Sequence, residues 1–309
     1  MLPLSKSRVI AGLGLGLAAG TALGFYALAP NVPGGPSSTG SATHRELEEQ
    51  TSAREIAEGK NKASDAVLED VASSAVRSKL DGKSVVLIYT DDAPRSDVEA
   101  TRRLLRQAGA KLTGSVALTD KAVRSNSGDD IKSIAANSLP AGAKLSEKNL
   151  TPGMHAGQLL GAALKSGSKA ASETDRGVVF GSLKKADYIK YDGEAPKAAE
   201  AAVIITGNRA DDADNGNYAT NFLADFSAGV DQAMKNVVLA GQPQSAEKNG
   251  AIGIVRGKAE YADAFSTVDN VDSVAGRITV VQGLAREVKG RSGHFGAAEN
   301  AAAASANDG

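Results

Sequence analysis

Hydrophobic residues are distributed along this chain as one long apolar stretch, followed by short apolar runs that polar and glycine-rich segments separate. The long stretch, residues 9–30, reads VIAGLGLGLAAGTALGFYALAP and carries no charge. At about 1.5 Å of rise per residue, a helix of this length can cross a hydrocarbon core of about 30 Å. The pattern therefore predicts a single N-terminal transmembrane helix.

The charges around this stretch predict its orientation. Two basic residues lie in segment 1–8, and no further charge occurs before Arg45. Because basic flanks stay in the cytoplasm, we expect residues 1–8 to be a cytoplasmic tip and the bulk of the chain to be extracytoplasmic. The alternative is a signal peptide cleaved after residues 27–29, although Pro30 would follow the cut and the apolar run is long for this purpose.

Glycines recur every four residues within the apolar stretch. This spacing puts them on one helix face, where two helix backbones can approach closely. The sequence therefore predicts a helix–helix contact, and with it a homo-oligomer, through Gly12, Gly16, Gly20 and Gly24.

The segment after the apolar stretch changes character twice. Residues 31–43 are rich in Pro, Gly, Ser and Thr and predict a flexible spacer. Residues 44–81 favour a helix, with Val67, Val71 and Leu80 forming a thin apolar stripe. We expect a membrane-proximal stalk helix. A short coiled coil is only the alternative, because clean heptads are few.

Residues 82–290 alternate between short apolar runs and helical patterns, which predicts an extracytoplasmic α/β domain with a doubly wound, mostly parallel sheet. The expected strands are residues 84–90, 112–118, 202–206, 237–240 and 252–255. The expected helices include residues 120–136, 155–164, 218–236 and 278–288. Two short segments, 178–183 and 188–191, fit either a helix or a strand. Residues 291–309 are Gly-, Ala-, Ser- and Asn-rich and predict a disordered tail.

The amino-acid composition of the chain excludes some kinds of chemical site and some partners. The chain has no cysteine, three methionines, three histidines and a net charge of −1. The absence of cysteine excludes disulfides, thiolate catalysis and thiolate metal sites. The near-neutral charge argues against a nucleic-acid partner.

The predicted strand ends are where a doubly wound sheet binds ligands. The residues expected to line this ligand crevice are Asp91, Asp92, Gly207 and Gly241. The two aspartates suit a hard cation, or they form the turn before Pro94. Asp269 and Asp272 flank a later turn as helix caps or ligands. No phosphate-binding loop or hydrolase motif occurs, so we expect no enzymatic activity and no resident cofactor.

Several short motifs together resemble the actinobacterial MctB-type copper transport proteins. They occur in the order of that family and span Gly82 to Lys289. The motifs are Gly82-Lys83-Ser84-Val85-Val86, Gln107-Ala108-Gly109-Ala110, Ser115-Val116-Ala117-Leu118-Thr119, Leu139-Pro140-Ala141-Gly142, Ala156-Gly157-Gln158-Leu159-Leu160-Gly161, Ser266-Thr267-Val268-Asp269 and Gly276-Arg277-Ile278-Thr279-Val280. The resemblance implies a role in keeping intracellular copper low, and a channel in the outer envelope.

Copper would be a transported ion rather than a cofactor. Copper(I) favours sulfur ligands and copper(II) favours imidazole, which makes Met154, His155 and His294 the candidate metal ligands. The alternative is that Met154 fills a gap in the core and His155 lies at a helix start.

We therefore expect a membrane-anchored cell-envelope protein acting in copper efflux and copper homeostasis, with an oligomeric channel as one form of that role. The alternative is a non-catalytic envelope scaffold or a ligand-binding module without copper transport. The sequence leaves open whether the inner or the outer membrane holds the anchor.

Overall fold

The computed structural model describes residues 41–209 and 217–306, with side chains described from Glu49 onward. The chain divides into two units, residues 1–63 and 64–309. The predicted cytoplasmic tip, transmembrane helix, glycine contact and most of the spacer lie outside the described residues. None of the helices in the described ranges is both long and apolar enough to cross a bilayer.

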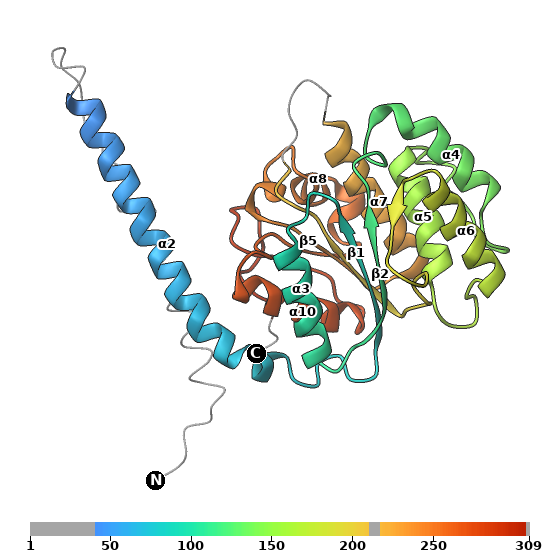
Figure 1. The fold of residues 1–309 in the computed structure, drawn as a ribbon, viewed down its shortest axis with the longest axis horizontal. Coiled ribbons are helices and arrows are strands. Elements are labelled where there is room, and N and C mark those ends of the chain that lie inside the picture. Colours follow the sequence, from blue (N-terminus) through green and yellow to red (C-terminus); the bar gives the residue numbers. More distant parts are fainter. Residues whose placement is uncertain (1–40, 210–216, 307–309) are drawn as a thin grey trace, which may run out of the picture. The chain divides into compact units, whose positions relative to one another are not determined.

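A seven-stranded sheet forms the centre of the second unit (Figure 1). Its strands stand in the order β3-β2-β1-β4-β5-β6-β7, and every neighbouring pair is parallel except β2 with β3. The strands are β1 (Ser84–Thr90), β2 (Lys111–Leu118), β3 (Ile189–Lys190), β4 (Ala201–Ile205), β5 (Val237–Ala240), β6 (Ser266–Val268) and β7 (His294–Phe295).

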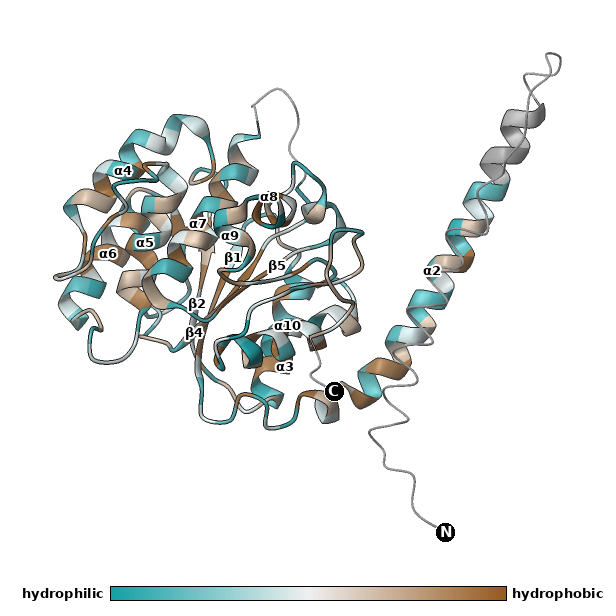
Figure 2. Cartoon of the chain, turned by 180° about the vertical axis from the view of Figure 1, so that it is seen from behind, coloured by the Kyte–Doolittle hydropathy of each residue, from teal (hydrophilic) through white to brown (hydrophobic). Residues whose placement is uncertain are grey.

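Helices cover both faces of the sheet, which confirms the mostly parallel α/β prediction. One face carries α4 (Gly128–Asn137), α5 (Pro152–Leu164), α6 (Glu173–Lys185), α7 (Tyr218–Met234), α8 (Ala251–Gly257) and α9 (Ala259–Ala262). The other face carries α3 (Arg95–Gln107) and α10 (Val274–Glu287). Short 3₁₀ turns are η1 (Ser125–Ser127) and η3 (Pro243–Ala246). Figure 2 shows hydrophobic residues concentrated on the central strands.

Two separate apolar clusters result from the alternation of side chains along each strand. In β1, Val86 and Ile88 point to the face covered by α5 and α7, whereas Val85 and Leu87 point to the face covered by α3 and α10. Both faces of the central strands are buried, so these strands are nearly continuous apolar runs. This burial explains why four of the five expected strands are confirmed.

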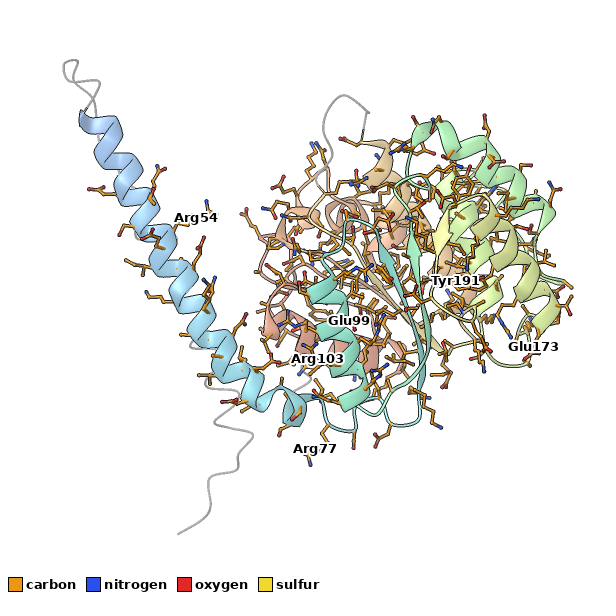
Figure 3. The ribbon with its side chains drawn as sticks, viewed as in Figure 1. Arg54, Arg77, Glu99, Arg103, Glu173 and Tyr191 are labelled. Carbon is orange, nitrogen blue, oxygen red and sulfur yellow. The ribbon has the colours of Figure 1, made fainter. Side chains whose placement is uncertain are left out.

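The helix α2 (Ser41–Val76) covers most of the region where a helix is expected, whereas residues 77–81 form a turn. Its side chains from Glu49 to Ala63 are exposed, and Arg54 is labelled among them in Figure 3. Within the second unit, Ala72 and Val76 join the apolar cluster of α3 and α10. The Asp65 carboxylate accepts a hydrogen bond from the Val274 N–H at 3.1 Å, which caps the start of α10.

The prediction of a strand at residues 252–255 is wrong, because this run is part of the helix α8. Its buried residues include Ala251, Ile252 and Val255, which recur at helical rather than strand spacing. The run is short, and its β-branched residues resemble those of a buried strand. Of the two ambiguous pieces, 178–183 belongs to α6 and 188–191 contains β3.

The prediction of a disordered tail is wrong for residues 291–306. His294 and Phe295 form β7, which pairs with β6 at the edge of the sheet. Phe295 and Ala306 are buried. The composition of this segment is misleading because strand pairing, the buried Phe295 and polar contacts to the rest of the domain hold it, although apolar residues are few.

Candidate functional site

The order of the strands reverses between β1 and β4, because β1 continues to β2 on one side while β4 continues to β5 on the other. In a doubly wound sheet this reversal opens a crevice at the carboxyl ends of the strands. Asp91 and Asp92 follow β1, Gly207 follows β4 by two residues, and Gly241 follows β5 directly. The fold thus brings the predicted crevice residues to one edge of the sheet.

Both aspartates of the crevice are already paired with cations of the same chain. Asp91 Oδ2 lies 3.3 Å from Lys190 Nζ and accepts a hydrogen bond from the Asp120 N–H at 3.3 Å. Arg209 lies between two carboxylates, with Nε 3.8 Å from Asp92 Oδ2 and Nη2 3.0 Å from Asp120 Oδ1. These pairs are partly exposed, so each contributes at most about 1 kcal/mol to stability.

The two glycines of the crevice allow loops to pack closely. A Cβ atom at Gly207 would overlap the carbonyl oxygen of Asp92. A Cβ atom at Gly241 would overlap Ser245 Oγ, which also donates a hydrogen bond to the Gln242 carbonyl at 2.6 Å. The chain's own atoms therefore fill the space next to both glycines.

Met154 and His155 lie in the first turns of α5, where Thr151 Oγ1 accepts a hydrogen bond from the Met154 N–H at 3.3 Å. The Met154 side chain is fully buried in the apolar cluster on the face of the sheet that α5 and α7 cover. His155 is 8% exposed, and its Nε2 lies 3.1 Å from the Ser146 carbonyl oxygen. The sulfur and the imidazole are thus both held within the packed domain.

His294 lies on β7, on a different element from Met154 and His155. Its Nδ1 is 2.9 Å from Thr267 Oγ1, and its Nε2 is buried with no hydrogen-bond partner in the described chain. Burial, and then the charge of Arg256, lower the pKa of this imidazole below its ordinary value. Over the described ranges, no group of three or more His, Cys, Asp or Glu side chains could hold a metal ion.

A buried ion pair next to His294 was missed by the sequence reasoning. Arg256 on α8 and Asp269 after β6 pair at 2.7 Å, with side chains 4% and 0% exposed. Asp269 does not cap α10, because Ser273 Oγ accepts the hydrogen bond from the Gly276 N–H. The available signal was Arg256, a lone arginine within the apolar run 252–257. If this run is buried, the guanidinium needs an anionic partner.

The sheet order, the two helix layers and the strand ends define a doubly wound α/β domain whose strand-end groups are paired with residues of the same chain. The model of the family described as "Copper transport outer membrane protein, MctB" matches residues 8–306. This chain belongs to the MctB family, which confirms the resemblance expected from the sequence.

Individual relatives match along nearly the same length. The proteins called Copper transporter MctB in Mycobacterium tuberculosis and Mycobacterium bovis are each 33% identical to this chain over 309 residues, covering 97% of this chain and 98% of the relative. The Copper transporter MctB of Mycobacterium leprae is 37% identical over 230 residues, covering 72% of this chain and 71% of the relative.

Proposed function

We propose that this chain is a cell-envelope protein that acts in copper transport out of the cell and thereby in copper homeostasis. The observation that carries the proposal is the family match over residues 8–306, together with relatives that bear the name copper transporter. Because the match covers both the N-terminal segment and the α/β domain, the proposal concerns the chain as a whole.

The finer parts of the proposal come from the sequence. Residues 9–30 anchor the chain in a membrane, and the basic segment 1–8 keeps the α/β domain on the extracytoplasmic side. The anchor and the stalk bring copies of the chain together, and the resulting oligomer forms the channel through which copper is transported. The proposal assigns no catalytic step and no resident cofactor, and copper enters as cargo.

The test is total cell copper, with and without the gene, over a range of external copper, with zinc measured in the same cells. Selective accumulation of copper in the deletion strain, reversed by the full chain, supports the proposal. Unchanged copper, or equal rises in copper and zinc, would contradict it.

Two variants test the candidate sulfur and imidazole ligands in the complemented strain. Met154→Leu conserves the volume of a buried side chain, and His155→Gln keeps a polar side chain next to the Ser146 carbonyl. Loss of copper export by either variant at normal protein level would assign copper contact to this pair. Full export by both variants would remove the pair from the proposal.

The second candidate function is a non-catalytic envelope scaffold. The observation that favours it is the set of strand-end groups paired within the chain, with Asp91 on Lys190 and Asp92 beside Arg209. A scaffold defect would sensitise cells to many envelope stresses alike, whereas a copper transporter defect would show as selective copper accumulation.

A further inference from the structure

The segment after α10 returns to the sheet and folds back on itself. We name residues 293–306 the strap. Within it, the Ala302 N–H donates to the His294 carbonyl at 2.9 Å, and the Gly296 N–H donates to the Ala303 carbonyl at 3.0 Å. The strap thus forms a compact edge beside β6, with β7 as its paired part.

Arg256 connects the strap to the sheet. Its Nε donates to Thr267 Oγ1 at 3.0 Å, and its Nη1 donates to Asp269 Oδ2 at 2.7 Å. Its other two bonds reach the strap, from Nη1 to Asn300 Oδ1 at 2.7 Å and from Nη2 to the Phe295 carbonyl at 2.8 Å. One buried guanidinium therefore holds both the end of β6 and the strap.

Asp269 binds the strap from the other side of the ion pair. Its Oδ1 accepts hydrogen bonds from the Ala297 N–H at 2.7 Å and the Ala298 N–H at 3.1 Å. Gly296 has a φ of +136°, and a Cβ atom there would overlap the Asp269 carboxylate. The backbone of the strap is thus fitted closely to this carboxylate.

The strap buries little apolar surface of its own. Phe295 and Ala306 are its buried hydrophobic side chains, and most of the remaining residues are Gly, Ala, Ser and Asn with exposed or partly exposed positions. Besides the pairing of β7 with β6 and the burial of Phe295, its attachment rests on polar contacts at Arg256 and Asp269. These contacts use one backbone carbonyl, two backbone N–H groups and one side-chain carboxamide, which are groups that an extended peptide carries.

The contacts at Arg256 and Asp269 lie together at one end of β6. Asp269 directly follows β6 at the carboxyl edge of the sheet, two strands away from the reversal between β1 and β4. We propose that Arg256, Thr267 and Asp269 form a peptide-binding site at this strand end, and that the strap fills it as a releasable internal ligand. The ligand class is an extended, small-residue peptide bearing an asparagine. This proposal is independent of copper transport.

Hydrogen exchange on the full chain tests whether the strap can be released. Asn300→Ala removes the carboxamide that bonds Arg256 and the Ala246 carbonyl. We expect amides of the strap to exchange at least about 10-fold faster, since a hydrogen bond to a charged group is lost, while β1 and β4 keep their protection.

The matched control is Asn149→Ala. Its carboxamide donates to Tyr261 Oη at 2.8 Å, within a different buried polar cluster. This variant should leave exchange in the strap unchanged. Unchanged strap exchange in Asn300→Ala, or strap amides that exchange only together with β1 and β4, would overturn the releasable strap.

A second measurement tests the site itself. A fluorescent peptide with the sequence of residues 293–306 is titrated into the full-length Asn300→Ala chain, whose own strap is weakened. We expect saturable binding, at least about 10-fold weaker for a peptide carrying Asn300→Ala and lost when Asp269→Asn is added to the chain. No binding, or equal binding of both peptides, would overturn the peptide site.

Discussion

At the scale of single residues, two buried carboxyl groups lie near the amino ends of β5 and β6. Burial raises the pKa of Glu287 to about 7, although Ser266 Oγ donates a hydrogen bond to its Oε1 at 2.6 Å. Burial likewise raises the pKa of Asp231 to about 6, and Lys235 Nζ lies 3.6 Å from its Oδ2. The folded chain therefore binds these protons more tightly than the unfolded chain does.

The Glu287→Gln variant should flatten the dependence of stability on pH. A raised pKa in the folded state contributes stability that is full below pH 4.5, the ordinary pKa of the group, and is lost as pH rises to about 7. The linkage relation makes this loss about 3 kcal/mol for Glu287. Urea unfolding at pH 4.5 to 8 should show a smaller decrease for the variant than for the unaltered chain.

Glu200→Gln is the control with the opposite sign. Hydrogen bonding by the Ser84 N–H, and then by Lys83, lowers the pKa of Glu200, so its contribution is present at neutral pH and lost as the solution becomes acidic. If Glu287→Gln unfolds with the same pH profile as the unaltered chain, Glu287 does not hold its proton in the folded state.

At the scale of elements, α5 and α7 pack backbone against backbone. A Cβ atom at Gly157 would overlap the Phe226 carbonyl oxygen and lie 2.9 Å from the Val230 nitrogen. A Cβ atom at Gly153 or Gly161 would likewise overlap atoms of α7, and a Cβ atom at Gly229 of α7 would overlap atoms of α5. Eleven of the 13 residues of α5 and 13 of the 17 residues of α7 are buried. The resemblance motif at residues 156–161 is thus a packing surface.

Gly157→Ala should destabilise the domain by about 1–3 kcal/mol, because the added methyl group has no space at the contact. Gly177→Ala is the matched control, since no atom lies within 4 Å of a Cβ there. In an exposed helix this control should be neutral or stabilising by up to about 1 kcal/mol. Equal unfolding midpoints for the two variants would show that α5 can shift away from α7 at little cost.

At the scale of the whole molecule, the family match covers both an N-terminal segment outside the described residues and an α/β domain with its own core. The domain adds no spanning helix within the residues that the structure describes. In our proposal, residues 9–30 therefore anchor the chain, and they assemble it together with the stalk.

Replacing Gly16 and Gly20 together by leucine should reduce self-association of the full chain in detergent, because leucine prevents close approach of two helix backbones. Leu15 and Leu17 replaced together by isoleucine provide a control that keeps the apolar length. Cross-linking yield and sedimentation measure the result. An unchanged oligomer in the glycine variant would mean that another part of the chain carries the assembly.

The amino-acid sequence was sufficient to predict the features that depend on local pattern. The strands 84–90, 112–118, 202–206 and 237–240 were predictable because burial on both faces produces continuous apolar runs. Their alternation with helices was sufficient for the class of fold, and short motifs in order were sufficient for the family.

Features that depend on partners distant in sequence became visible in the folded chain. The run 252–255 became a helix because α8 packs one side against the core, and residues 291–306 became ordered because Arg256 and Asp269 bind them. The crevice residues Asp91 and Asp92 acquired cationic partners from Lys190 and Arg209. The partners in these hydrogen bonds and ion pairs lie far apart along the chain, so no local pattern of residues identifies them.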